Sequence, residues 1–476
     1  MEYYLVLTVS TVIIAVMAGV LWLKTRSVSF PLGIAFMYYW SLYGGWSIII
    51  DRLGGDSGKH YDYLEDRLFP IYLDDYYFWS LILYTTFIML VGIVLIFSVK
   101  AVTTSNSKHR PVIRVSHSVI MCIAAAAGLA SYLLVRDDLQ SAVALDKSLY
   151  LLTRGADAEV SKYFTIHQEL NRIALVPSAL GLAVLLSGKN PLLIAGRGGL
   201  CAGLGYLIVL GGMVWFAFLL GNKNELFLAG VAACLFYLAN ANAPKIIALA
   251  VLATVGVLAM WLIDLLRGFP LGDFVVAIAN LEMADLMGIG QFIASSNEAF
   301  GAHFSMYGAL AYGINPTYGS SLLSLMVSAI PRLLWPSRPE DIYVYYAESV
   351  SATPGQGYSI HHATGWYLNF SVPGVIIGAL VLGWIWAKCF NSYVHAGAGR
   401  ACWYYVLTAL APWMFASYIP SLIRAGPEGY KGLIIEGFLV PTLVLTFASY
   451  QRGVFARLLS KPRQLMSEPV GHMDPA

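Results

Sequence analysis

Long apolar runs separated by short polar connections make up most of this chain. A membrane-spanning helix needs roughly 20 mostly apolar residues, and eleven runs approach that length. They cover residues 4–23, 28–50, 76–99, 116–135, 172–188, 198–220, 225–241, 245–263, 367–387, 401–419 and 431–449. The pattern therefore predicts an all-α polytopic membrane protein with about 11 transmembrane helices.

Composition supports this class. The mean hydropathy is +0.68 over 476 residues, and 58% of the residues are hydrophobic, which is too apolar for a soluble domain. The net charge of +2 provides no basic surface of the kind that binds nucleic acid. We therefore expect membrane lipid and a membrane-borne substrate as partners, and no nucleic acid.

The distribution of charges predicts the orientation. If the N-terminus lies outside, the inner connections and the C-terminal tail hold 15 of the 29 basic residues but only two of the 27 acids. Cytoplasmic connections carry an excess of Lys and Arg, so the N-terminus is expected in the periplasm and the C-terminus in the cytoplasm. Glu2 stands where a signal peptide would carry a basic residue, so the first span is expected to stay in the protein.

Four regions follow from the spacing of the runs. We expect transmembrane helices 1–8 in 1–263, a large periplasmic loop in 264–366, helices 9–11 in 367–449 and a cytoplasmic tail in 450–476. Within the loop, Ser320 to Trp335 is apolar along one face and too short to span, as interfacial helices are. Such a helix would deliver Arg332 and Arg338 to the level of the lipid headgroups.

Basic residues at the outer ends of the spans are candidates for binding phosphate, because ionisable groups beside a bilayer need a partner or a task. Arginine suits phosphate because its planar fork forms two parallel charge-assisted hydrogen bonds. The candidates are Arg332, Arg338, Arg424, Lys223 and Arg267. The alternatives are that Arg332 and Arg338 snorkel or pair with Glu340 and Asp341, that Lys223 faces water, and that Arg424 caps helix carbonyls.

The same outer segments contain groups that can take a proton. A general base for a sugar hydroxyl should be a carboxylate or imidazole near the hydroxyl, and the candidates are His362, His361 and Glu298. The adjacent histidines have no third ligand at helical or hairpin spacing, so no metal is expected. Aromatic residues that could stack on sugar faces are Tyr343, Tyr358, Trp366 and Tyr367.

Two motifs resemble a known family. Residues 330–340, "IPRLLWPSRPE", look like a Pro-Arg-x-x-Trp-Pro-x-x-Pro segment, and "TGWYLNFSVPG" from Thr364 resembles Gly-Glu-x-Tyr-x-Asn-Phe-Gly followed by Gly. The sequence is similar in these respects to the O-antigen and exopolysaccharide repeat-unit polymerases, the Wzy-type family. Trp366 stands where an acid is common in that pattern, and Ser371 where glycine is common.

The resemblance implies a GT-C-like glycosyltransferase of the bacterial inner membrane. It would move a growing glycan from undecaprenyl diphosphate to the non-reducing end of an incoming lipid-linked repeat unit. The five cations named above would bind the diphosphate, one of His362, His361 and Glu298 would act as base, and no cofactor would be needed. A chain-length regulator and a flippase of the same pathway are further expected partners.

Other functions remain open from the sequence. An O-antigen ligase-like transferase uses the same donor with another acceptor. A lipid-linked oligosaccharide transporter or flippase should carry buried ionisable residues in the centres of its spans, where this sequence has almost none. A non-enzymatic scaffold would use the charged late loop to dock proteins.

Overall fold

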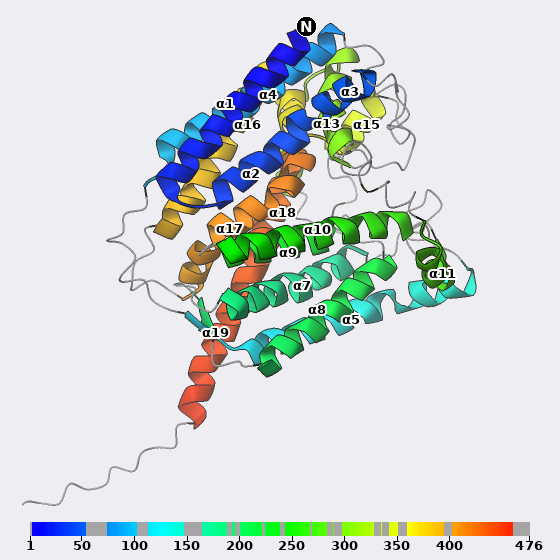
Figure 1. Ribbon diagram of the computed structural model, residues 1–476, viewed down its shortest axis with the longest axis vertical. Coiled ribbons are helices and arrows are strands. Elements are labelled where there is room, and N and C mark those ends of the chain that lie inside the picture. Colours follow the sequence, from blue (N-terminus) through cyan, green and yellow to red (C-terminus); the bar gives the residue numbers. More distant parts are fainter. Residues whose placement is uncertain are drawn as a thin grey trace, which may run out of the picture.

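The computed structural model describes residues 2–53, 74–101, 113–146, 164–187, 193–195, 200–220, 224–238, 243–266, 269–282, 289, 298–327, 335, 342–350, 359–394 and 402–459. Within these ranges the regular structure is helical except for one pair of three-residue strands. The arrangement is shown in Figure 1.

Eight helices in the described ranges are long and apolar enough to cross a membrane. Their spanning parts are Glu2–Thr25, Asp75–Ser98, His117–Ala144, Ile166–Leu186, Cys201–Leu220, His362–Val394, Trp403–Arg424 and Gly426–Ser449. The hydrocarbon core offers backbone groups no hydrogen-bond partner, so such apolar segments satisfy their own backbone as helices. The chain is a multi-pass membrane protein, and the predicted all-α class is confirmed.

The three other predicted spans correspond to helices that are interrupted, short or described only in part. The elements are α2 (Ser29–Tyr38), the π-helix η1 (Tyr39–Tyr43) and α3 (Gly44–Leu53) for 28–50, α9 (Asn224–Leu238) for 225–241, and α10 (Ala243–Leu266) for 245–263. The α9 helix has 15 residues, and α10 has 24, of which the side chains of 243–252 lie outside the description. The total of about eleven spans stays a prediction.

One group of helices combines the two ends of the sequence. It contains α1 (Glu2–Thr25), α2, α4 (Asp75–Ser98) and α16 (His362–Val394), with α4 packed against both α1 and α16 (Figure 1). The α4 helix begins where the Asp74 side chain accepts a hydrogen bond from the Tyr77 backbone N–H at 2.9 Å. Trp386 of α16 stacks on Phe30 of α2, with ring centroids 5.2 Å apart.

A second group is formed from the middle of the chain. It contains α5 (His117–Ala144), α7 (Phe164–Ser187), α8 (Leu200–Leu220), α9 and α10, and α7 packs against α5, α8 and α9 (Figure 1). Polar side chains join α5 to α7, where the Ser131 hydroxyl donates to Asn171 Oδ1 at 2.8 Å. Such hydrogen bonds hold helices together in a membrane, where lipid removes the hydrophobic driving force for their association.

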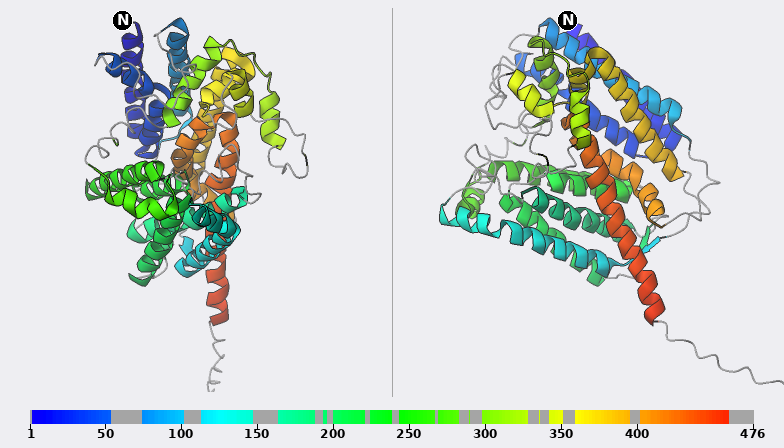
Figure 2. Two further views of the ribbon diagram at one scale, coloured as in Figure 1. Left: turned by 90° about the vertical axis from the view of Figure 1, so that its right-hand side faces the viewer. Right: turned by 180° about the vertical axis from the view of Figure 1, so that it is seen from behind.

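The α17 helix (Cys402–Arg424) connects the two groups. Of the residues in its membrane-spanning part, 89% are buried, against 22% to 61% in the other seven spanning helices, so α17 occupies the centre of the fold. It packs against α2 and α16 on one side and α9 on the other. The α19 helix (Val440–Leu459) lies against α17, α5 and α7 and extends beyond them (Figure 2). It also contacts strand β1 (Ile113–Val115), which pairs in parallel with β2 (Leu193–Ala195).

The late region between α10 and α16 contains short helices. They are η4 (Leu271–Asp273), α11 (Phe274–Ala279), α13 (Glu298–Ala311), α14 (Ser320–Val327) and α15 (Ile342–Ser349). Ile342 and Tyr346 of α15 pack with Ala309, Ile360 and Leu368 in a small apolar core of their own. The α14 helix covers the first half of the expected interfacial helix, and residues 328–334 lie outside the described ranges.

Several helix ends differ from the sequence-based boundaries. The α5 helix continues to Ala144 rather than ending at 135, so the polar residues Arg136, Asp137 and Asp138 lie within the helix. The α7 helix begins at Phe164 rather than 172, so the outer segment expected at 136–171 is shorter. The α16 helix begins at His362 rather than 367, which places the second candidate histidine at the start of a helix.

The α16 helix is broken near its start. Phe370 (φ −142°, ψ 21°) and Ser371 (φ 56°, ψ −145°) leave helical geometry, and the segment before them folds back. The Trp366 indole therefore lies against Gly378, although twelve residues of continuous helix would separate their Cα atoms by about 18 Å. The Trp366 carbonyl likewise lies against Gly374. Ser371 has the positive φ that favours glycine, the residue common at this place in the resembled motif.

Candidate functional site

Several outer segments predicted to carry chemistry meet around the end of α17. Ile360, just before α16, forms a parallel β-bridge with Ala425. The Glu428 carboxylate accepts a hydrogen bond from the backbone N–H of Ile342 at 2.8 Å, which ties the start of α15 to the same place. The last span begins here with η5 (Gly426–Glu428) and continues through α18 (Gly429–Gly432) and the π-helix η6 (Leu433–Leu439) into α19, and Gly426 has φ +55°.

His362 is fully buried and bonded at both ring nitrogens. Nδ1 lies 2.8 Å from the Gly426 carbonyl oxygen, which can only accept, so Nδ1 carries the proton. Nε2 then accepts from the Trp366 indole N–H and the Tyr430 hydroxyl, each at 3.2 Å. For His362 to act as a base, the substrate would have to displace these donors.

His361 and His303 share Ser41 as a partner, and both are buried. The Ala363 backbone N–H donates to His361 Nδ1 at 3.0 Å, so His361 Nε2 carries the proton and donates to Ser41 Oγ at 2.8 Å. His303 Nδ1 donates to the Ser41 carbonyl at 2.8 Å, and its Nε2 accepts from the Tyr77 hydroxyl at 2.8 Å. Both histidines are therefore neutral in this arrangement and fix η1 against α13 and the start of α16.

Burial makes these histidines sensitive to acid. Burial lowers the pKa of His303 to about 4, although the hydrogen bond from His303 to the Ser41 carbonyl acts in the opposite direction. Burial also lowers the pKa of His361, and repulsion from His362 and His303 lowers it further. An unfolded histidine titrates near 6.5. Between pH 6.5 and about 4, His303 binds a proton in the unfolded chain but not in the folded protein. The contribution of His303 to the free energy of unfolding is therefore complete above pH 6.5 and is lost as the pH falls toward 4.

We predict that the melting temperature in detergent is constant from pH 8 to 7 and falls steadily from pH 6.5 to 4.5. His303 alone accounts for about 3 kcal/mol once the pH has reached 4. The His303→Asn variant, whose amide can still donate to Ser41, should show a shallower fall than wild type. Equal slopes for the two proteins would contradict the assignment of the acid sensitivity to His303.

Arg424, at the end of α17, is the predicted diphosphate-binding residue that the described ranges include. It is half-buried, and its Nη1 donates to Asn224 Oδ1 at 3.0 Å. Asn224 begins α9 and follows Lys223 directly in the sequence. The contact therefore joins the end of α17 to the start of α9, which follows a second predicted cation in the sequence.

An ionic cluster of Glu169, Arg172, Glu225 and Glu436 lies beside this contact. Arg172 Nη1 is 2.7 Å from Glu169 Oε1 and 2.5 Å from Glu436 Oε1, and its Nη2 is 3.6 Å from Glu225 Oε1. The Tyr418 hydroxyl donates to Glu436 Oε2 at 2.8 Å. The cluster connects α7, α9, α17 and η6, the elements that join the second group to the central helix.

The predicted sugar-stacking residues differ in exposure. Tyr343 and Tyr367 are half-buried and pack against the small apolar core at α15. Trp366 is 7% exposed, and its ring is covered by Gly378 of its own helix. Tyr343 and Tyr367 are thus better placed than Trp366 to meet a sugar in this conformation.

Other predicted site residues lie outside the described ranges, namely Lys223, Arg267, Arg332, Arg338 and Tyr358. Glu298 opens α13, and its side chain is likewise outside the description. The roles given to these residues stay predictions.

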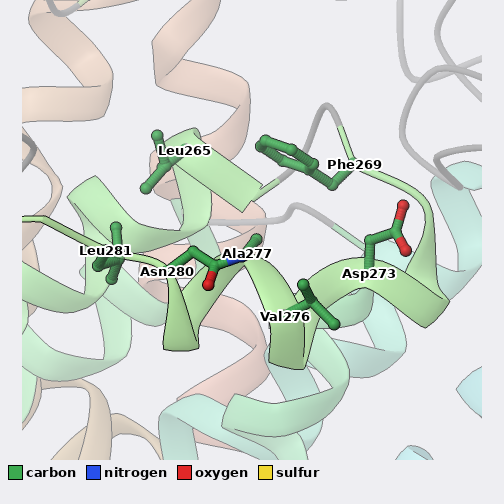
Figure 3. A pocket seen from close by; sticks show the side chains of 7 residues that line it. All are labelled: Leu265, Phe269, Asp273, Val276, Ala277, Asn280 and Leu281. Carbon is green, nitrogen blue, oxygen red and sulfur yellow. The ribbon is translucent and has the colours of Figure 1, made fainter.

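A cavity of about 460 Å³ lies at the end of α10 (Figure 3), and no residue of the ionic cluster lines it. Its walls are apolar except for Asp273 and Asn280; the other lining residues are Leu265, Phe269, Val276, Ala277 and Leu281. Neither the candidate histidines nor Arg424 line it, so the cavity is separate from the site at the end of α17.

Arg172 and Glu169 were missed as candidates by the sequence analysis. Their three-residue separation on a helix is a readable signal, because it allows an ion pair at the border of an apolar run. The convergence of Glu225 and Glu436 on Arg172 was not readable, since these acids lie 53 and 264 residues from Arg172 in the sequence and approach it only in the fold.

Comparison with known proteins gave no matching family model, no similar curated protein and no similar solved structure. What the fold and hydropathy define is the class, a multi-pass membrane protein. The resemblance to repeat-unit polymerases stays a prediction.

Proposed function

We propose that this protein is a polysaccharide polymerase of the bacterial inner membrane. It transfers a growing glycan from undecaprenyl diphosphate to the non-reducing end of an incoming lipid-linked repeat unit at the periplasmic face. The proposal includes the GT-C-like architecture of about eleven spans, a periplasmic N-terminus and a cytoplasmic C-terminus. The pathway's flippase and chain-length regulator are its proposed partners.

The observation that carries the proposal is the convergence at the end of α17. Arg424, the histidine pair and α15 come from segments far apart in sequence, yet the Ile360–Ala425 bridge and the Glu428–Ile342 hydrogen bond bring them together. A transferase needs a cation close to the leaving diphosphate and a base close to the acceptor hydroxyl, so both groups must lie in the same substrate-binding site. This arrangement supplies both kinds of residue from one end of the helices.

The proposed chemistry breaks the bond between the sugar anomeric carbon and the diphosphate oxygen and forms a bond to the acceptor oxygen. Arg424, with Lys223, Arg267, Arg332 and Arg338, stabilises the negative charge on the departing diphosphate. The acceptor proton goes to a base chosen from His362, His361 and Glu298. The reaction as proposed uses no metal and no cofactor.

The test is gel analysis of surface polysaccharide from a deletion strain carrying wild type or Arg424→Ala, with membrane protein levels checked. We expect the deletion to abolish the polymer ladder while single repeat units are still made. Losing a charge-assisted hydrogen bond of about 1.5–3 kcal/mol predicts roughly 10- to 100-fold less polymer in Arg424→Ala. Arg424→Lys should retain part of the activity.

The matched control is Arg136→Ala, which removes an exposed arginine of α5 and should leave the ladder unchanged. An intact ladder in the deletion strain would reject polymerisation. Long polymer that accumulates on its lipid carrier without reaching its final acceptor would instead identify a ligase-like transferase.

One observation favours a second candidate, a transporter of lipid-linked oligosaccharide. Buried ionisable groups between spans are typical of transporters, and Arg172, Glu225 and Glu436 form such a group. In that case the deletion strain would accumulate repeat units that remain inaccessible from the periplasm, whereas loss of a polymerase leaves them accessible there.

A further inference from the structure

One end of the first helix group carries four basic side chains. The opposite end of this group lies near Asp74, whose carbonyl accepts a hydrogen bond from the Tyr3 hydroxyl at 3.0 Å. The basic residues are Lys24 and Arg26 at the end of α1, Lys100 after α4, and Lys388 near the end of α16. The segments that form this basic end, residues 19–36, 90–101 and 380–394, contain no Asp or Glu.

Hydrogen bonds join the three helix ends into one surface. The Lys24 ammonium donates to the Ile96 carbonyl of α4 at 2.6 Å and has two further N–H groups to offer. Asn391 of α16 accepts from the Lys100 backbone N–H at 2.9 Å and donates to the Ser98 carbonyl at 2.8 Å. Because α4 packs against both α1 and α16, cations from all three helices lie at the same end of the group (Figure 1).

Aromatic side chains place this basic end at the level of the lipid headgroups. The Arg26 guanidinium carbon is 5.7 Å from the centre of the Trp22 ring, and Lys388 Nζ is 5.5 Å from the centre of the Trp384 ring. Both tryptophans are exposed, and exposed tryptophan is enriched where a membrane meets water. Phe97, near the end of α4, is 83% exposed, so the lipid-facing apolar surface continues up to the cations.

The backbone of Arg26 supports a task for its side chain. Arg26 follows the last residue of α1 with φ +53°, in the left-handed region where glycine is the usual residue after a helix. A residue with a Cβ is strained there, and such strain gathers at functional positions. The arginine is thus held at a place where the backbone alone would favour glycine.

The alternative is that the cations only balance the negative ends of the helices. Each helix C-terminus carries the equivalent of roughly half a negative charge, so three ends do not balance four cations. In the described part of the chain, the ion pairs do not involve Lys24, Arg26 or Lys388. The basic end therefore has positive charge left for an outside anion.

We propose that this basic end binds a phospholipid with a negatively charged headgroup. Arg26 and Lys388 donate to its phosphate oxygens, with Lys24 and Lys100 adding to the positive field. The acyl chains lie along the exposed apolar faces of the helices, against Phe97 and its neighbours. This inference does not rest on the proposed polymerase activity.

The test compares the purified full-length protein in nanodiscs of phosphatidylcholine alone and of phosphatidylcholine mixed with phosphatidylglycerol. We expect a higher melting temperature with phosphatidylglycerol, and a smaller difference at high salt. Arg26→Gly should lose most of this difference, yet its melting temperature in phosphatidylcholine alone should equal or exceed that of wild type because glycine relieves the positive φ. Native mass spectrometry should show about fivefold weaker binding of phosphatidylglycerol by Arg26→Gly.

Lys388→Gln is a second variant that leaves the backbone unstrained, and it should also weaken binding. Arg136→Gln, which alters an exposed arginine of α5, is the matched control and should bind phosphatidylglycerol as wild type does. Equal melting temperatures of wild type in the two kinds of nanodisc would overturn the proposal, as would equal binding by wild type and both variants. A rise produced by inorganic phosphate in phosphatidylcholine alone would also overturn it, because the site would then take a free anion rather than a lipid.

Discussion

Replacing Arg172 with alanine should destabilise the protein by about 3–5 kcal/mol, the cost of leaving buried charges without their partner. Glu225 and Glu436 are 3% and 14% exposed, so water cannot replace the guanidinium. Tyr418 would remain as a donor to Glu436 but carries no positive charge. The measurement is the melting temperature in detergent by fluorescence-detected size-exclusion chromatography, together with the yield of folded protein.

Three variants separate the loss of charge from other effects. Arg172→Lys keeps the charge but not the fork that reaches several carboxylates, so an intermediate melting temperature is expected. Adding Glu436→Gln to Arg172→Ala removes one unpaired charge and should recover part of the loss. Arg136→Ala, on the exposed face of α5, should have little effect. A melting temperature of Arg172→Ala equal to that of wild type would show that the cluster does not stabilise the fold.

The spanning helices could be predicted from the sequence because their signal is local. An apolar run of sufficient length can satisfy its backbone hydrogen bonds in a bilayer only as a helix. Among the described residues, eight of the eleven runs correspond to helices that are both long and apolar enough to span. The predicted positions of helix ends were less accurate where a helix continues through polar residues. Arg136, Asp137 and Asp138 read as the start of a loop, but α5 continues through them to Ala144.

The candidate site was predicted only in part. The sequence indicated that His361, His362 and Arg424 belong to outer segments, and the fold brings them to the end of α17. It gave no indication that Ser41, Tyr77 and Tyr430 occupy the histidine nitrogens, because those contacts join distant segments. The convergence of Glu225 and Glu436 on Arg172 could not be predicted for the same reason, since these partners come from other helices.

The break in α16 is also a feature of the fold rather than of local sequence. Pro373 lies near it, but a proline alone bends a helix and does not turn the chain back on itself. What the reversal requires is a surface without side chains, which Gly374 and Gly378 provide for Trp366. His362 and Trp366 both precede the break and lie four residues apart on one face of the helix, which places them within hydrogen-bond distance of each other, at 3.2 Å.

We therefore expect Gly374→Ala to have the second large effect on stability. An added Cβ would overlap the Trp366 carbonyl oxygen and lie 2.8 Å from its carbonyl carbon, and backbone atoms on both sides cannot move aside. Overpacking of this kind typically costs about 1–3 kcal/mol, and rigid backbone places this site at the upper end or above. The measurement is the melting temperature, with tryptophan fluorescence reporting any displacement of Trp366.

Two further substitutions should leave the melting temperature unchanged or raise it, in contrast to Gly374→Ala. Gly211→Ala makes the same change on α8, where nothing lies within 4 Å of the new Cβ, and should be neutral or slightly stabilising because alanine favours helix. Ser371→Gly should raise the melting temperature, since it relieves a positive φ that costs a residue with a Cβ roughly 1–3 kcal/mol. If Gly374→Ala and Gly211→Ala behaved alike, the reversal at Phe370 and Ser371 would be wrong, and α16 would continue as an ordinary helix through these residues.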